Sequence, residues 1–205
     1  MSPPRSRLQT RPGSLLLHRM TIRYRDAKAG SRHDGSMSKG RTVRPWVAND
    51  VEQIGWLHSH SRRQAYAGLV PIEALARVTP TEQAGVWRAR MARLPQRHVA
   101  LVIEQAGEVI GFALGQLEAE SGAQLNAIHV LPEQQGTGAG QELMDSVVSA
   151  FRDWGVADAH LHVIAGNERA QAFYRRNGWF LHGAAGSHQV GGALVSILEY
   201  RLVIA

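Results

Sequence analysis

Cysteine is absent from all 205 residues of the sequence. This absence excludes a disulfide framework, a thiolate metal site and a cysteine nucleophile. No apolar run approaches the ~18 residues that a membrane-spanning helix needs. The short apolar segment SLLLHRM near the start is not followed by the small-residue cleavage pattern of a secretory signal. We therefore expect a soluble, cytoplasmic protein that has no membrane partner.

Excess positive charge is confined to the first 40 residues. Residues 1–40 contain nine basic and two acidic residues, whereas the other 165 contain 14 basic and 15 acidic residues. The formal net charge of +6 therefore comes from this segment. We interpret it as a basic, disordered N-terminal extension, or as the result of an early start assignment, because Met20 and Met37 also offer starts. Nucleic-acid binding is disfavoured because the segment has almost no aromatic residues.

From residue 41 onward, strand patterns alternate with helix patterns, which predicts one domain over residues 41–205. Apolar runs predict strands over 42–46, 123–131, 158–166, 179–184 and 193–203, and two strands within 98–118 that are joined by the turn EQAGE. Helical spacing of apolar residues predicts a helix over 49–66, a second helical region over 71–94, and helices over 140–154 and 167–178. Because helices separate several of the strands, we expect an α/β fold with a mixed sheet.

Residues that favour helix ends mark the expected boundaries. Asn49 or Asp50 would cap the first helix, Thr81 is a candidate N-cap in the second helical region, and Asn167 would cap the last helix. Gly178 would end the last helix as its C-cap.

Three glycines stand at alternate positions where a strand passes into a helix. The segment LPEQQGTGAGQEL (131–143) contains Gly136, Gly138 and Gly140. The first amides of a helix have no intrahelical acceptor, and the helix dipole adds partial positive charge there. Glycines also let the backbone approach an anion closely. The segment favours a phosphate-binding loop over the alternative, a turn that only packs the helix against the sheet.

Neither common nucleotide-binding loop fits this segment. A P-loop requires lysine and a hydroxyl residue after its last glycine, and the sequence has Gln141 after Gly140. A dinucleotide-binding fingerprint requires glycine or alanine at the sixth position, which is Gln141 when the count starts at Gly136. The loop also follows a hairpin rather than a first strand.

The loop residues Gln135 to Gly140 resemble the Gln/Arg-x-x-Gly-x-Gly/Ala loop of the GNAT superfamily, the acyl-CoA-dependent N-acyltransferases. NERAQAFYRRNGWF (167–180) is similar to the signature of that family's fourth helix. Residues 42–71 resemble its first strand and helix. The resemblance covers about residues 41–203. It implies a mixed, mostly antiparallel central sheet with splayed parallel strands and flanking helices.

The resemblance also implies how acetyl-CoA binds as co-substrate. The pyrophosphate of coenzyme A would lie on the loop residues, which are Gln135, Gly136, Thr137, Gly138, Ala139, Gly140 and Gln141. The pantetheine arm would pair with the edge of the preceding strand at Ile128, His129 and Val130, much as an added strand would. Asn167 would contact the arm, while its position also suits the N-cap of the helix that follows.

Tyr174 is the candidate catalytic residue. It follows Phe173 at the position where the family commonly carries a tyrosine that acts as general acid. Acyl transfer from a thioester expels a thiolate, and a phenol with a pKa near ~10 is a suitable proton donor to that sulfur. The alternative is a core aromatic residue, since Tyr174 lies at helical spacing from Ala170.

The residue that accepts the proton of the amine is left open. Gln124 occupies the position where relatives often carry glutamate, and Asn126 and His129 replace two tyrosines that are common in that strand. The candidate bases are Glu118, Glu120, His129 or a water molecule.

Other histidines and arginines carry alternative interpretations. His58 and His60, and His160 and His162, have a spacing that could bind a metal, but a third ligand is lacking nearby, so we expect solvated or core-edge histidines and no metal. The end of the first helix would line the acceptor site or simply face solvent; its residues there are Arg62, Arg63 and Tyr66.

Together these features predict an enzyme that transfers an acetyl group from acetyl-CoA to a primary amine by direct attack in a ternary complex. The alternative is a coenzyme A-binding regulator or a degenerate, non-catalytic member of the family. The acceptor would be a small molecule or a peptide amine, with specificity set by loops such as residues 182–192. A homodimer is compatible with the sequence.

Overall fold

The computed structural model describes residues 40–119 and 122–204. The predicted extension 1–40, apart from residue 40, and the candidate base Glu120 lie outside the described residues. No helix within the described ranges is long and apolar enough to cross a membrane.

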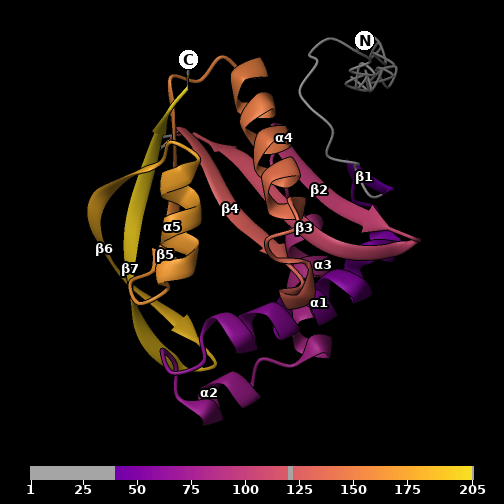
Figure 1. Ribbon diagram of the computed structural model, residues 1–205, viewed down its shortest axis with the longest axis vertical. Helices are drawn as coiled ribbons and strands as arrows, with labels where there is room; N and C mark the ends of the chain where they lie inside the picture. The colour runs from indigo at the N-terminus through magenta and orange to yellow at the C-terminus, as the bar shows by residue number, and fades with distance from the viewer. Residues whose placement is uncertain (1–39, 120–121, 205) are drawn as a thin grey trace, which may run out of the picture. The chain divides into compact units, whose positions relative to one another are not determined.

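Groups of helices and groups of strands follow one another along the described chain (Figure 1). The helices are α1 (Val51–Ala65), α2 (Ile72–Ala76), α3 (Pro80–Met91), α4 (Ala139–Asp153) and α5 (Glu168–Arg176), with short 3-10 turns at η1 (Ala48–Asp50) and η2 (Pro132–Gln134). The strands are β1 (Arg41–Pro45), β2 (His98–Gln105), β3 (Glu108–Glu118), β4 (Gly122–Val130), β5 (Asp158–Ile164), β6 (Phe180–Val190) and β7 (Ala193–Val203).

The strands form one sheet of seven in the order β1-β2-β3-β4-β5-β7-β6. Every neighbouring pair is antiparallel except β4 and β5, which are parallel. These two strands pair only from Ala123↔Ala159 to Leu125↔Leu161, and beyond Leu125 they part. The predicted fold class, a mostly antiparallel mixed sheet with splayed parallel strands and flanking helices, is confirmed.

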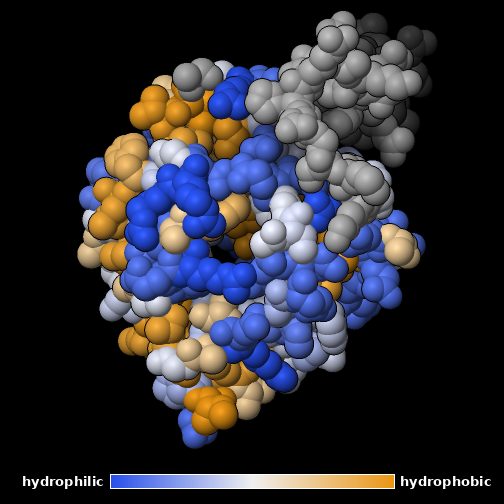
Figure 2. Space-filling view, viewed as in Figure 1, coloured by the Kyte–Doolittle hydropathy of each residue, from blue (hydrophilic) through white to orange (hydrophobic). Residues whose placement is uncertain are grey.

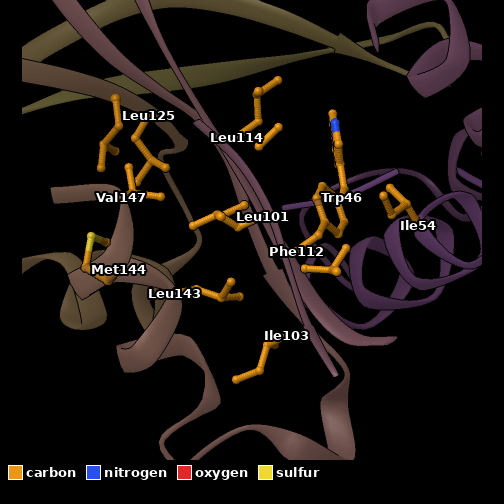
Figure 3. Packing of buried hydrophobic residues seen from close by; sticks show 14 of the residues in the cluster. Trp46, Ile54, Leu101, Ile103, Phe112, Leu114, Leu125, Leu143, Met144 and Val147 are labelled. Atoms are coloured by element: carbon orange, nitrogen blue, oxygen red, sulfur yellow. The ribbon is translucent and has the colours of Figure 1, made fainter. Parts of the chain in front are cut away.

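Helices cover both faces of the central strands, with α4 on one face and α1 and α3 on the other (Figure 1). Figure 3 shows Leu143 and Met144 of α4 on one side of the strands, and Trp46 and Ile54 on the other. The approach of α4 requires glycine in β3, since a Cβ on Gly115 would lie 2.7 Å from the ring of Phe151. The core therefore fixes where α4 begins, and with it the position of the glycine loop.

Two of the predicted helix ends differ from the structure. Thr79, not Thr81, caps α3: its Oγ1 accepts a hydrogen bond from the backbone N–H of Glu82 at 3.2 Å. Pro80 then occupies the first helical position, where a residue without an N–H loses nothing. Asp50 precedes α1 but does not cap it, because its carboxylate accepts instead from the backbone N–H of Val47 at 2.7 Å.

The boundaries of α5 agree more closely with the prediction. Asn167 caps the helix, and its Oδ1 accepts from the backbone N–H of Ala170 at 3.2 Å. The C-cap is Asn177, one residue earlier than predicted, and Gly178 follows it with a φ of +81° that favours glycine.

The predicted loop 182–192 is mostly strand. β6 continues to Val190 and pairs with β7 as far as Val190↔Ala193, with irregularities between Leu181 and Gly183 and between Ala184 and Ser187. Pairing with the strongly β-forming β7 outweighs the low strand propensity of this segment. Only Gly191 and Gly192 form the turn, and a Cβ on Gly191 would overlap the carbonyl oxygen of Ala74 in α2.

Candidate active site

A cavity of about 760 Å³ opens where β4 and β5 part. At one end, the loop end, it is lined by the glycine segment before α4. At the other, the acceptor end, it is lined by residues of α1, α3 and β6, which are His58, Ser61, Arg62, Tyr66, Gln83, Trp87, Arg90 and His188. Figure 2 shows an opening between α5 and α4 that is bordered largely by hydrophilic residues.

The glycine loop contains backbone amides without a described backbone acceptor, and three of its residues, Gly136, Gly138 and Gly140, line this cavity. Gly136 and Gly138 adopt φ values of +80° and +98°, in the left-handed region that favours glycine. Among the described residues, the backbone N–H groups of Gly136, Gly138, Ala139 and Gly140 have no backbone acceptor. These donors stand at the N-terminus of a 15-residue helix, where the dipole favours an anion.

The other predicted loop residues already use their backbone N–H groups. Gln135 donates to the carbonyl oxygen of Pro132, Thr137 to that of Gln134, and Gln141 to that of Gly138. The structure therefore narrows the set of free amide donors to four of the seven predicted residues. The Oε1 atom of Gln135 is buried without a hydrogen-bond partner.

Arg41 of β1 holds the loop in place, a role that sequence reasoning missed. Its guanidinium donates to Oγ1 of Thr137 at 2.8 Å and to the carbonyl oxygen of Thr137 at 3.0 Å. It also forms an ion pair with Glu142 in the first turn of α4, at 2.7 Å. The hydroxyl of Thr137 in turn donates to the carbonyl oxygen of Gln134. No sequence spacing could reveal this contact, because 96 residues separate Arg41 from Thr137.

The edge of β4 runs along the cavity from the loop toward Tyr174. Ile128, His129 and Val130 pair with β3 on one side, but lie beyond the last pairing with β5. All three line the cavity, as does Asn167. Asn126, in the same stretch, has a buried Oδ1 atom without a hydrogen-bond partner.

Tyr174 lines the cavity and is only 8% exposed. Its ring packs near Trp179 and Tyr200, at centroid distances of 6.4 and 6.2 Å. Burial raises the pKa of the Tyr174 hydroxyl well above its ordinary value, and the nearby Tyr66 raises it further. Tyr174 therefore keeps its proton throughout the neutral range.

The side chain of His129 points away from α4, into a group of aromatic and polar residues at the acceptor end. Its ring stacks on Phe112 at 5.3 Å and lies 4.6 Å from the ring of His58, and its Nδ1 is 3.0 Å from Oγ of Ser61. Trp87 donates to Nδ1 of His58 at 3.0 Å.

Both rings of this pair are neutral. Burial, and then the charge of Arg62, lower the pKa of His129 to about 3. Burial also lowers the pKa of His58 well below its ordinary value, with His129 and Arg62 adding to the effect. A base with so low a pKa accepts a proton weakly near neutral pH.

Some of the other candidate residues line this cavity, and others do not. Arg62 and Tyr66 both line the cavity, with the Arg62 guanidinium 5.3 Å from the centre of the Tyr66 ring. Arg63 is exposed and is not among the lining residues. Glu118 is not among the lining residues of this cavity but lines a second one with His160 and His162.

The two histidine pairs differ in the structure, because the rings of one pair are neighbours while His58 is buried and His60 lies at the surface. The rings of His160 and His162 are 5.7 Å apart, and His60 stacks on Trp56 at the surface. Within residues 40–119 and 122–204, three or more histidine, aspartate or glutamate side chains nowhere come together to hold a metal ion. Sequence reasoning also missed the α3 residues that line the acceptor end, because nothing in their pattern distinguishes a cavity-facing side chain from a core one.

Comparison with known proteins identifies relatives of the same fold and family. The family described as "Acetyltransferase (GNAT) family" matches residues 56–179. An uncharacterized N-acetyltransferase of Mycobacterium bovis is 32% identical over 87 residues, which cover 42% of this chain and 56% of the relative. An uncharacterized N-acetyltransferase of Bacillus subtilis is 28% identical over 130 residues, covering 62% of this chain and 73% of the relative. The chain thus spans little more than half the length of the mycobacterial relative.

Solved structures share the same architecture. The PaiA N-acetyltransferase of Thermoplasma acidophilum, solved in complex with coenzyme A, superposes with a TM-score of 0.65 at 18% identity, covering 80% of this chain and 98% of that one. The ribosomal-protein-S18-alanine N-acetyltransferase of Escherichia coli superposes with a TM-score of 0.58 at 20% identity, covering 80% and 94%. With the family match extending over more than half of its length, this chain belongs to the GNAT family of acetyltransferases.

Proposed function

We propose that the chain is an enzyme that transfers an acetyl group from acetyl-CoA to a primary amine, within a ternary complex. The observation that carries the proposal is the continuity of one cavity, which runs from the unpaired amides of the glycine loop, along the free edge of β4, to Tyr174 and the acceptor end. Membership of the GNAT family supports the same reaction class.

The residues at the loop end fit coenzyme A. A pyrophosphate needs several converging donors, and the four free N–H groups from Gly136 to Gly140 supply them beside a helix N-terminus. Gly136 leaves open space, since no atom lies within 4 Å of the position of a Cβ there. The unpaired edge at Ile128, His129 and Val130 suits an extended arm with amide groups, and Asn167 lies on the same wall. Acetyl-CoA, when bound, supplies a thioester carbonyl carbon.

The reaction requires two proton movements. The nitrogen of the amine forms a bond to the thioester carbon as the bond from that carbon to sulfur breaks, so the amine loses a proton and the departing thiolate gains one. Tyr174 lines the cavity, and its hydroxyl keeps its proton throughout the neutral pH range. The same burial would also raise the pKa of a thiol placed there, so the departing thiolate would be a stronger base than it is in water.

Water is the acceptor of the amine proton in this proposal. His129 and His58 are weak bases here because their pKa values are low. Glu118 faces the second cavity, and Gln124 has no basic atom. The described residues that line the main cavity include no carboxylate. A water in the cavity, held by neutral polar groups such as those of Gln124 and Asn126, can relay the proton to solvent.

Release of free thiol from acetyl-CoA with a panel of primary amines tests the proposal. We expect turnover that depends on both the amine and acetyl-CoA, together with N-acetylated product. Binding of coenzyme A without turnover across the whole panel would instead favour the regulatory, non-catalytic alternative.

A further inference from the structure

The acceptor end of the cavity is positively charged. Arg62 of α1 and Arg90 of α3 both line it, and no aspartate or glutamate lies among its described lining residues. A cationic amine such as a polyamine needs carboxylates to replace the water that it loses on binding, and the described wall supplies none.

Arg62 lies at the acceptor end with no counter-charge from the described residues in contact with it. Among the described residues its guanidinium forms no ion pair, and its Nε atom is buried without a hydrogen-bond partner. Its known contact is the face of the Tyr66 ring, at 5.3 Å. A buried donor without an acceptor is costly, so a ligand that supplies an acceptor there gains correspondingly.

The charge of Arg62 is central to the acceptor end. Burial is the largest cause that lowers the pKa of three histidines on three different elements, and the charge of Arg62 lowers each of them further; they are His58 of α1, His129 of β4 and His188 of β6. Because these rings are kept largely uncharged, they neither compete with Arg62 for an anion nor neutralise it.

Arg90 is a weaker candidate for the same role. Its side chain lies over the ring of Trp87 at 5.7 Å. Burial lowers the pKa of Arg90, and the charge of Glu118 acts in the opposite direction. A guanidinium that already feels the charge of a carboxylate has less to gain from a ligand anion.

We infer that the acceptor amine carries an anionic group, most simply the carboxylate of an amino acid, and that Arg62 binds this group and positions the amine. The inference rests on the proposed function and adds the class of acceptor. Guanidinium and carboxylate form two parallel hydrogen bonds, which fixes the orientation of the ligand as well as its position. An acceptor of this kind carries its own carboxylate beside its ammonium group. The described residues of the acceptor end therefore need not supply a carboxylate to balance that ammonium charge.

Matched acceptors test the inference. The free α-amino acids would be compared with their carboxamides, with spermidine, and with 2-aminoethyl phosphate against ethanolamine, which separates carboxylate from phosphate. We expect kcat/KM to be at least ~10-fold higher for the best free acid than for its carboxamide, the scale of one charge-assisted interaction. Equal values for acid and carboxamide, or a preference for spermidine, would overturn the inference while leaving acetyl transfer intact.

Variants of Arg62 locate the effect. In R62Q the preference for the anionic acceptor should fall to within ~3-fold of the carboxamide, mainly through a higher KM, and R62K should restore only part of it. R63Q is the matched control, because Arg63 is the next residue on the same helix but is exposed and outside the cavity. An undiminished preference in R62Q, or the same loss in R63Q, would remove Arg62 from this role.

A binding measurement keeps the inference separate from catalysis. In the presence of coenzyme A, N-acetyl amino acids should raise the melting temperature of the wild type, whereas the matching N-acetyl amino acid amides should not. This difference should vanish in R62Q and persist in R63Q. If no amine is turned over, the proposed function fails, and the presence or absence of this difference still decides whether Arg62 binds an anionic group in the cavity.

Discussion

Replacement of Gly138 by alanine separates the cost of backbone strain from the loss of an anion site. Gly138 has a φ of +98° at the N-terminus of α4, and Gly155 has a φ of +69° just past its C-terminus. An L-residue in the left-handed region costs roughly 1–2 kcal/mol. Both G138A and G155A should therefore lower the free energy of unfolding by about that amount, which corresponds to a melting temperature lower by roughly 2–8 °C for a chain of this size.

The two variants should differ in their affinity for coenzyme A. A Cβ on Gly138 would lie 3.3 Å from Nη2 of Arg41, whereas no atom lies within 4 Å of a Cβ on Gly155. G138A relieves its strain by rotating the loop amides and moving Arg41. Loss of one hydrogen bond to a charged group costs roughly 1.5–3 kcal/mol, so the Kd for coenzyme A should rise by about 10- to 150-fold.

Isothermal titration with coenzyme A, paired with thermal unfolding, measures both quantities. G155A should match the wild type in Kd while it loses stability. If G138A binds coenzyme A as tightly as G155A does, the loop amides do not hold the pyrophosphate and the reasoning is refuted.

Three further substitutions probe other parts of the account. R41Q removes the guanidinium that holds Thr137 and Glu142, so the Kd for coenzyme A should rise several-fold with a smaller change in kcat; unchanged affinity in titrations would show that the loop keeps its shape alone. Y174F should lower kcat at least tenfold and leave the affinity for coenzyme A unchanged, and an unaltered kcat in the thiol-release assay would rule out Tyr174 as proton donor. His129 has a pKa of about 3 in the folded state, below its unfolded value of ~6.5. Between these two values the unfolded chain binds a proton that the folded chain does not. The free energy of unfolding therefore falls by up to ~1.4 kcal/mol per pH unit as the pH drops from ~6.5 toward 3. In H129Q, urea unfolding between pH 6.5 and 4 should therefore depend less on pH than in the wild type, and an identical pH dependence would contradict the burial of a neutral imidazole.

Local sequence patterns predicted the backbone elements of the site. The glycine loop, the strand before it and the cap at Asn167 follow from residues that are close together in the sequence, and the structure has each of these elements. Their geometry depends on φ angles and helix ends, which short segments specify well. The roles of individual residues at the loop and at Tyr174 stay predictions.

Side chains that meet from distant elements could not be predicted. Arg41 reaches Thr137 only because β1 and the start of α4 come together in the fold, and the direction of His129 was fixed only by its register opposite Phe112. The later part of β6, beyond the predicted strand 179–184, was mistaken for a loop because its small and polar residues have low strand propensity, and pairing with β7 overrides that propensity.

The most direct test of the central claim is a crystal structure of the protein with coenzyme A. We predict that pyrophosphate oxygens lie about 2.7–3.2 Å from the backbone nitrogens of Gly136, Gly138, Ala139 and Gly140. The arm should follow the edge of β4, and its sulfur should lie beside the Tyr174 hydroxyl. Coenzyme A bound elsewhere, or a pyrophosphate that makes no contact with these amides, would contradict the account.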